Sequence, residues 1–193
     1  MLLPDHEIKR YLGLGRIIID PFEDWMIQPA SVDIQIGNEF MWYHISSPHT
    51  RNIDLDPFEK LHEEDVVRVQ GPGPFRLSPG DFCLATTLQR ITIDPGIAAR
   101  IEGKSTLGRR GIIVHSTAGF IDPGFSGQLT LEMANLSHRP ILLKVGMPIA
   151  QLSFTLLTAP AARPYGHGDL GSHYQGQAGV TGPEPLHRYK EAT

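Results

Sequence analysis

Apolar and polar residues alternate along much of the chain, and this alternation predicts short β-strands. In GQLTLEMANL, residues 127–136, Leu129, Leu131 and Met133 fall on one face and the intervening polar side chains on the other. SVDIQIGNEF, residues 31–40, alternates in the same way, with its valine and isoleucines on one face.

Turn-forming sequences divide the chain into short apolar segments. They are GPGP at 71–74, SPG at 78–80, DPG at 94–96 and 122–124, and VGMP at 145–148. The apolar segments include RIIID, FCLATTLQRITI, GIIVHSTAGF and PIAQLSFTLL. Short strands at this spacing, with few helical patterns, predict a mainly β fold, either a sandwich, a jelly roll or a distorted barrel.

The N-terminus differs from this strand-rich middle. Ile8, Tyr11 and Leu12 fall on one face of a short helix, which Gly13 ends. A polar segment, residues 46–66, interrupts the strands further along.

The C-terminal part also changes character. Beyond Pro160 the chain is rich in glycine and poor in aliphatic residues, so composition alone favours a disordered tail. The predicted organisation is one β-domain with its N-terminal helix over residues 1–160 and a tail over 161–193. We find no repeat and no second domain.

Composition and charge narrow the function classes. The chain has 193 residues, 40% of them apolar and 20% charged, which are ordinary values for one globular domain. Its net charge of −4 argues against a general nucleic-acid binder, so an anionic ligand needs a local cationic cluster. No signal peptide and no membrane-length apolar run is evident. The lone Cys83 is expected to be a buried thiol in a reducing cytoplasm.

The segment GKSTLGRRG, residues 103–111, resembles an ATPase phosphate loop but departs from it. The Walker signature needs a glycine six positions before its lysine, and Ala98 stands there. Two internal glycines would each cost a following helix about 1 kcal/mol relative to alanine. The segment still gathers three cations and a hydroxyl: Lys104, Ser105, Arg109 and Arg110. These residues alone leave open whether the ligand is ATP, another phosphorylated molecule or none.

Two carboxylates are candidates for chemistry. Glu132 lies on the polar face of the predicted strand 127–136, where partial desolvation would raise its pKa into a range useful for proton transfer. A glutamate on a solvated outer face is the alternative, and the pattern alone favours it. Asp122, in FIDPGFSG, is first of all a turn former.

The histidines do not indicate a metal site. None of the nine forms an HxH or HxxxH pair, and His115 is predicted to be a packed strand histidine. No zinc site is predicted.

Read together, four segments resemble the dCTP deaminase family of the dUTPase superfamily. They are QPASVDIQIG at 28–37, RIEGKSTLGRRGIIVHSTAGFIDPGFSGQLTLEMAN at 100–135, GMPIAQLSF at 146–154 and YGHGDLGSHYQGQ at 165–177. The resemblance covers most of the chain. It implies a homotrimer of distorted jelly-roll β-barrels of the dUTPase-like type, with nucleotide sites at the subunit boundaries. It also implies that residues 161–193 form a flexible lid, in place of the disordered tail.

The resemblance gives the cationic segment a ligand, the triphosphate of a deoxynucleotide. The side chains of Lys104, Ser105 and Arg109 would contact it. Backbone amides of a tight glycine-containing loop direct several donors at one anion, and here they would come from Ser105, Thr106, Leu107 and Gly108. Mg²⁺ is expected on the phosphates, mainly through water and without a protein cage.

Deamination adds water at C4 of cytosine and expels ammonia, so one group must move a proton. Zinc deaminases carry H-x-E and P-C-x-x-C motifs, and a chain with one cysteine cannot supply them. The resemblance assigns the general base to Glu132, positioning of the water to Ser105, and contacts to the carboxylate and substrate to Arg109. Asp122 would hold the deoxyribose and orient water. Further substrate contacts are implied for Thr130, Leu131, Gln151, Tyr165, His173 and Gln177.

Three positions refine this interpretation. His173 stands where the family usually has lysine, and a neutral imidazole offers one donor where an ammonium offers three. Gly119 and Phe120 resemble the bifunctional branch, which converts dCTP to dUMP, ammonia and pyrophosphate.

The alternatives to this bifunctional activity are a deaminase that releases dUTP, a dUTPase, and a non-catalytic nucleotide-sensing trimer.

Overall fold

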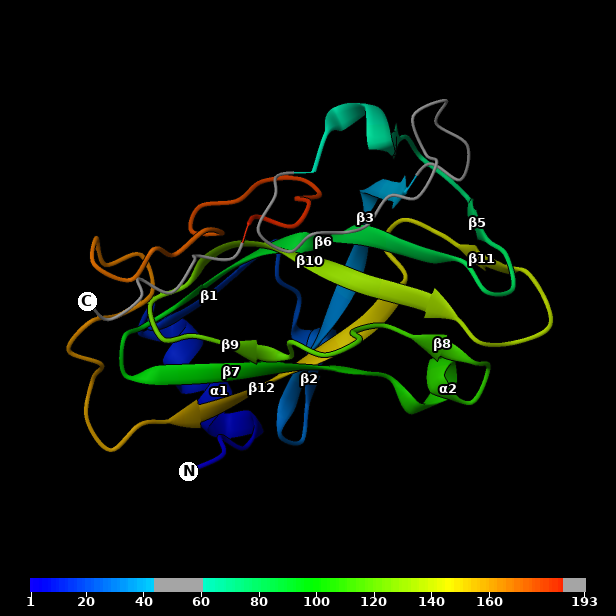
Figure 1. The fold of residues 1–193 in the computed structure, drawn as a ribbon. Coiled ribbons are helices and arrows are strands. Elements are labelled where there is room, and N and C mark those ends of the chain that lie inside the picture. The colour runs from blue at the N-terminus through cyan, green and yellow to red at the C-terminus, as the bar shows by residue number, and fades with distance from the viewer. Residues whose placement is uncertain (44–60, 186–193) are drawn as a thin grey trace, which may run out of the picture.

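A curled sheet of ten strands forms the body of the protein (Figure 1). The computed structural model describes residues 1–43 and 61–185. The strands are β1 (Ile17–Asp20), β2 (Ile27–Gln28), β3 (Ser31–Tyr43), β4 (Val66–Gln70), β5 (Phe75–Leu77), β6 (Phe82–Ile93), β7 (Ile97–Gly103), β8 (Ile112–Ile113), β9 (Phe120–Ile121), β10 (Ser126–Asn135), β11 (Ile141–Leu143) and β12 (Pro148–Leu156). The helices are α1 (Asp5–Gly13), α2 (Ser105–Gly108) and the 3₁₀ turns η1 (Asp24–Met26) and η2 (Glu63–Asp65).

The sheet runs in the order β8-β10-β6-β3-β12-β7-β9, and each of its ladders is antiparallel. β1 joins through β6, and β2 and β4 join through β3, while β5 and β11 form a separate ribbon. No pairing within the described ranges joins β8 to β9, so the curled sheet is a half-barrel. The prediction of a mainly β, barrel-type fold is confirmed.

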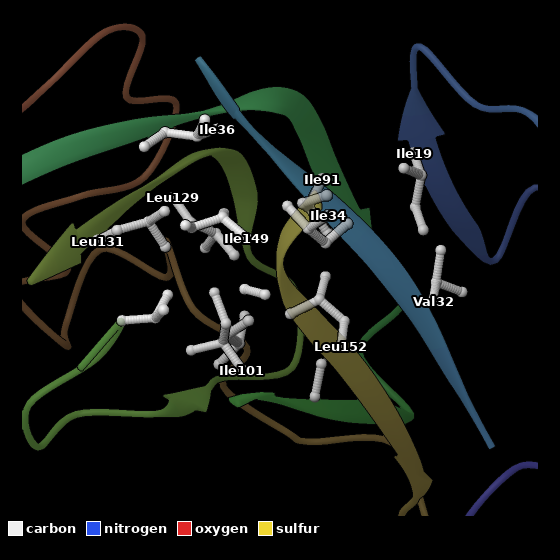
Figure 2. Close-up of a cluster of buried hydrophobic side chains, with 14 of the residues drawn as sticks. Ile19, Val32, Ile34, Ile36, Ile91, Ile101, Leu129, Leu131, Ile149 and Leu152 are labelled. Atoms are coloured by element: carbon white, nitrogen blue, oxygen red, sulfur yellow. The ribbon is translucent and has the colours of Figure 1, made fainter. Parts of the chain in front are cut away.

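The concave side of the sheet encloses the core (Figure 2). Ile34, Ile149 and Leu152 are completely buried and come from the two neighbouring strands β3 and β12. Leu131 of β10 is equally buried and approaches from another part of the sheet. Each such side chain contributes about 1.5–3 kcal/mol by leaving water, so the alternating apolar positions supply the stabilising face.

Most of the predicted elements are present. The segments containing β1, β3, β6, β10 and β12 are strands, and α1 ends at Gly13 as expected. Ile8 and Tyr11 are buried, and Leu12 packs partly against the core.

One predicted strand is wrong. GIIVHSTAGF, residues 111–120, forms only the short β8 and the first residue of β9, with irregular chain between them. Gly111 has φ of +84°, which is not a strand conformation, so β8 begins only at Ile112. Gly119 lies so close to β7 that a Cβ atom there would be 2.9 Å from the Ile101 carbonyl oxygen.

The C-terminal segment crosses the outer side of the sheet, as the orange-to-red trace in Figure 1 shows. Residues 161–185 contain no helix or strand, but they make hydrogen bonds to β10 and to the turn that precedes it. Gly124 of that turn, with φ of +90°, lies against Pro164, where a Cβ would be only 2.6 Å from the Pro164 Cβ. The DPG turn therefore also seats the C-terminal segment.

Two other expectations concern the polar segment and the thiol. Residues 44–60, most of the predicted polar segment, lie outside the described ranges, and Val66 already begins β4. Cys83 is buried, and burial raises its pKa to about 12. No helix in the described part of the chain is long and apolar enough to cross a membrane.

Candidate active site

A cavity of about 390 Å³ opens between the outer face of β10, the chain around β9 and the C-terminal segment. Six aromatic rings, two carboxylates and three side chains with hydroxyl or amide groups lie on its walls: Tyr43, Phe82, Phe120, Phe125, Tyr165, Tyr174, Asp122, Glu132, Thr130, Thr181 and Gln177. A largely aromatic wall with a few polar groups suits a flat, partly polar ligand.

The alternation of β10 places Glu132 in this cavity. Leu129, Leu131 and Met133 are buried on the core face, so Thr130 and Glu132 must point to the other side. Both are half-buried and line the cavity. Glu132 is therefore not the fully solvated outer-face residue that the pattern alone favoured.

Six residues predicted from the sequence meet here: Phe120, Asp122, Thr130, Glu132, Tyr165 and Gln177. They come from β9, the following turn, β10 and the C-terminal segment. Leu131 does not join them with its side chain, which is completely buried in the core. Its backbone pairs with Ala85 in the β10–β6 ladder.

Two tyrosines stand close to the two carboxylates. Burial raises the pKa of Tyr43 above its usual value, and the nearby Glu132 charge raises it further. Burial also raises the pKa of Tyr165; a hydrogen bond from the Tyr174 amide opposes this, and Asp122 adds to the rise. Both phenols therefore stay protonated at neutral pH and can donate hydrogen bonds.

A second cavity of about 380 Å³ adjoins the first and shares Asp122 and Tyr165 with it. Its other polar side chains are Arg163, Ser172 and His173. One end of the combined space thus carries Glu132 and aromatic rings, and the other carries a guanidinium and an imidazole. Such an arrangement fits a ligand with a flat ring and an anionic extension.

The predicted phosphate loop lies elsewhere on this chain. None of residues 104–109 lines either cavity. Lys104 donates a hydrogen bond from Nζ to Oδ1 of Asp33 at 2.5 Å, and the Asp33 side chain is only 8% exposed. Gln151, on β12, is the ladder partner of Asp33 and lies in the same neighbourhood.

The helix at this loop is short, as its glycines predicted. α2 has four residues and ends at Gly108, and Ser105 and Arg109 are exposed. In Figure 1 α2 lies at one end of the molecule, while the C-terminal segment lies toward the other. The candidate site residues therefore form two separate groups on one chain.

His115 corrects another expectation. It lies between β8 and β9 rather than in a strand, because the chain there follows the irregular path described above. Its ring lines the first cavity, and neither ring nitrogen has a hydrogen-bond partner.

Several cavity residues were missed by the sequence analysis. Tyr174 and Ser172 fall inside the segment that carried the family resemblance, and Arg163 lies two positions before it, so that segment was the available signal. Tyr43 had no comparable signal, because only the pairing of β3 with β6 brings it to the cavity. Asp33, which lies outside the two cavities and pairs with Lys104, had none either, because it falls on the polar face of its strand beside Gln35.

No cluster of three or more His, Cys, Asp or Glu side chains suited to a metal ion occurs in residues 1–43 and 61–185. The carboxylates Asp122 and Glu132 line the cavity without such a cluster.

Comparison with solved structures identifies the fold. The 2'-deoxycytidine 5'-triphosphate deaminase of Agrobacterium tumefaciens matches with a TM-score of 0.61 over 80% of this chain and 48% of that one, at 23% identity. The curled sheet thus has the fold of a nucleotide deaminase.

Sequence comparison specifies the family. Residues 2–157 match the dCTP deaminase-like domain, and the chain belongs to this family. It is 46% identical to the dUMP-forming dCTP deaminase of Mycolicibacterium vanbaalenii, over 94% of this chain and 94% of the relative. It is 47% identical to that of Beutenbergia cavernae, over 94% of this chain and 93% of the relative. The resemblance noted from the motifs is confirmed.

Proposed function

We propose that the protein deaminates dCTP and cleaves the resulting nucleotide, so that dUMP, ammonia and pyrophosphate leave. The main support is the position of Glu132 in an aromatic cavity, together with relatives named for this reaction over nearly their whole length. The cytosine would lie beside Glu132 and Thr130, the deoxyribose beside Asp122 and Tyr165, and the phosphates toward Arg163 and His173.

In the deamination step Glu132 acts as the general base. Its carboxylate takes a proton from water as the oxygen adds to C4 of cytosine. It then returns a proton to the amino group, which leaves as ammonia. The protonated phenol of Tyr43 lines the same cavity as Glu132 and is a potential hydrogen-bond donor to the water. The step consumes one water and needs no oxidant or reductant.

In the second step a water attacks the α-phosphorus and pyrophosphate leaves, with Asp122 orienting the water. The chain around Gly119 bears on this step because it forms the cavity edge between His115 and Phe120. A larger residue at 119 would collide with the Ile101 carbonyl oxygen and push this edge away from β7. Gly119 therefore supports the proposal that the protein carries out both reactions, deamination and pyrophosphate release.

A homotrimer explains the two separate groups of site residues. The triphosphate would be completed by Lys104, Ser105 and Arg109 of a neighbouring copy, with Gln151 beside them. Ser105, in α2, and Arg109, directly after it, are exposed and thus accessible to another copy. The Asp33 carboxylate holds the Lys104 ammonium in place for this contact.

Mg²⁺ would accompany the nucleotide rather than occupy a protein site. This ion keeps several waters and commonly binds through substrate phosphates. We place the protein in a reducing cytoplasm, because its one thiol is buried and unpaired.

Product analysis tests the proposal. Purified protein is incubated with Mg²⁺ and either dCTP or dUTP, and ammonia, pyrophosphate, dUMP and dUTP are followed. We expect dCTP to give ammonia and pyrophosphate in equal amounts, with dUMP as the end product.

The alternatives give different results. Accumulation of dUTP from dCTP identifies a monofunctional deaminase. Cleavage of dUTP without ammonia release from dCTP identifies a dUTPase. Nucleotide binding without turnover identifies a sensing protein.

A further inference from the structure

Residues 179–181 attach the C-terminal segment to the barrel, and Gly179 and Val180 lie outside the two cavities. Val180 is 7% exposed and belongs to a small apolar cluster with Met41, Val66 and Leu84, which is separate from the main core. Its side chain thus fills an apolar site formed by β3, β4 and β6, an unusual position for a residue in a glycine-rich polar segment.

Glu39 of β3 fixes the backbone on one side of this residue. The Val180 amide donates to Glu39 Oε2 at 3.2 Å, and Gln70 Nε2 donates to Glu39 Oε1 at 3.1 Å. Gly179 has φ of +73° and lies directly against the same carboxylate, so that a Cβ at 179 would collide with Oε2. Only glycine fits here without displacing Glu39.

Arg68 of β4 fixes the other side. Its Nη1 donates to the Val180 carbonyl at 2.8 Å, while Nε and Nη2 donate to Glu63. Both polar backbone groups of Val180 are therefore satisfied by side chains of the barrel. A buried backbone group without a partner would be costly, so these two contacts permit the burial of Val180.

The attachment continues directly into the wall of the first cavity. The Thr181 amide donates to Thr130 Oγ1 at 3.2 Å, and the Gly179 amide donates to Gln128 Oε1 at 2.8 Å. Gln177, two residues earlier, exchanges hydrogen bonds with the Gln128 backbone. Gln177 and Thr181 both line the cavity, so their positions depend on where residues 179–181 are held.

We propose that Glu39 and Arg68 are positioning residues, which hold Val180 in its apolar site without nucleotide and so keep the cavity wall of Gln177 and Thr181 in place. Neither side chain lines the first cavity. They act through the C-terminal segment. The consequence for catalysis rests on the proposed function, whereas the attachment itself does not.

Hydrogen exchange of the nucleotide-free protein tests the attachment. We expect the amides of Gly179, Val180 and Thr181 to be protected in the unaltered chain. Glu39→Ala and Val180→Ala should each speed their exchange about 10-fold, because each removes stabilisation of order 1 kcal/mol or more from the closed segment. Glu64→Ala, which removes an exposed carboxylate of η2, and Arg76→Gln, which removes an exposed guanidinium of β5, should change nothing.

Kinetics separate positioning from mere folding. Glu39→Ala, Arg68→Gln and Val180→Ala should raise KM for dCTP about 3- to 10-fold with kcat within about 2-fold, because lost uniform binding raises KM alone. Gly179→Ala should have the same effect, and Glu39→Ala combined with Gly179→Ala should be no worse than either alone, since both disrupt one contact. Val180→Ala leaves the barrel sequence unchanged, so it distinguishes the attachment from loss of folding.

Unprotected amides at 179–181 in the nucleotide-free unaltered protein would overturn the proposal. Unchanged exchange and KM in both Glu39→Ala and Val180→Ala would do the same. Protection without any turnover of dCTP would instead support the attachment and contradict the proposed function.

Discussion

At the scale of single residues, neighbours decide what Glu132 can do. Its strand neighbours Leu131 and Met133 are buried in the core, and this fixes the direction of its side chain. The phenol of Tyr43, whose pKa is raised by burial and by this carboxylate, lines the same cavity. Partial burial in an open cavity is compatible with the role of general base that we propose for Glu132.

Replacing Glu132 by Gln tests this role directly. The substitution keeps the shape and removes the proton acceptor, so we expect kcat for ammonia release to fall by about 10²–10⁴-fold, the usual contribution of a general base. The affinity for dCTP, measured by titration calorimetry, should change little. Glu64→Gln, at an exposed position, is the control. Turnover at the rate of the unaltered protein would remove Glu132 from the mechanism.

At the scale of elements, β10 serves the core and the candidate site at once. Its odd-numbered positions from Leu129 to Met133 are buried, and the even-numbered positions face the cavity or the C-terminal segment. The edge of the same strand receives the C-terminal segment through Ser126 and Gln128. Damage to its core face should therefore lower stability before it affects chemistry.

Leu131→Ala tests the core face of β10. The side chain is completely buried, so its truncation should lower the free energy of unfolding by about 2–5 kcal/mol. Denaturant unfolding at fixed protein concentration measures this. Leu136→Ala, just beyond the strand at a 67% exposed position, should stay within about 0.5 kcal/mol. Equal losses in both variants would contradict the assignment of faces.

At the scale of the whole molecule, one chain carries two groups of candidate site residues that it does not bring together. Glu132 and Asp122 line the cavities, while Ser105 and Arg109, at the two ends of α2, are exposed away from them. A symmetric assembly can join the two groups, because each copy offers its loop to the next.

Mixed assemblies test the shared site. Glu132→Gln and Arg109→Gln chains should each be nearly inactive alone. When they are unfolded and refolded together in equal amounts, about one quarter of the sites in a random trimer would combine an intact Glu132 with an intact neighbouring Arg109. Recovery of roughly that fraction of activity is expected, measured as ammonia release. No recovery, despite mixed trimers shown by mass spectrometry, would place both residues in one chain's site.

Sequence alone determined the strands whose residues alternate strictly, the N-terminal helix and the family. Those features depend on local periodicity and on long ordered motifs, both visible along the chain. It also named Asp122, Thr130, Glu132, Tyr165 and Gln177, which the fold places around one cavity. It mistook residues 114–119 for strand, because the close approach of Gly119 to β7 is a contact between segments distant in sequence.

Tertiary structure decided the rest. Only the β3–β6 pairing brings Tyr43 to the cavity, and only the crossing of the C-terminal segment adds Tyr174 and Arg163. The same crossing buries Val180, although composition had favoured disorder there. The physical reason is that burial and hydrogen-bond partners come from contacts across the fold, whereas alternation and composition describe each segment separately.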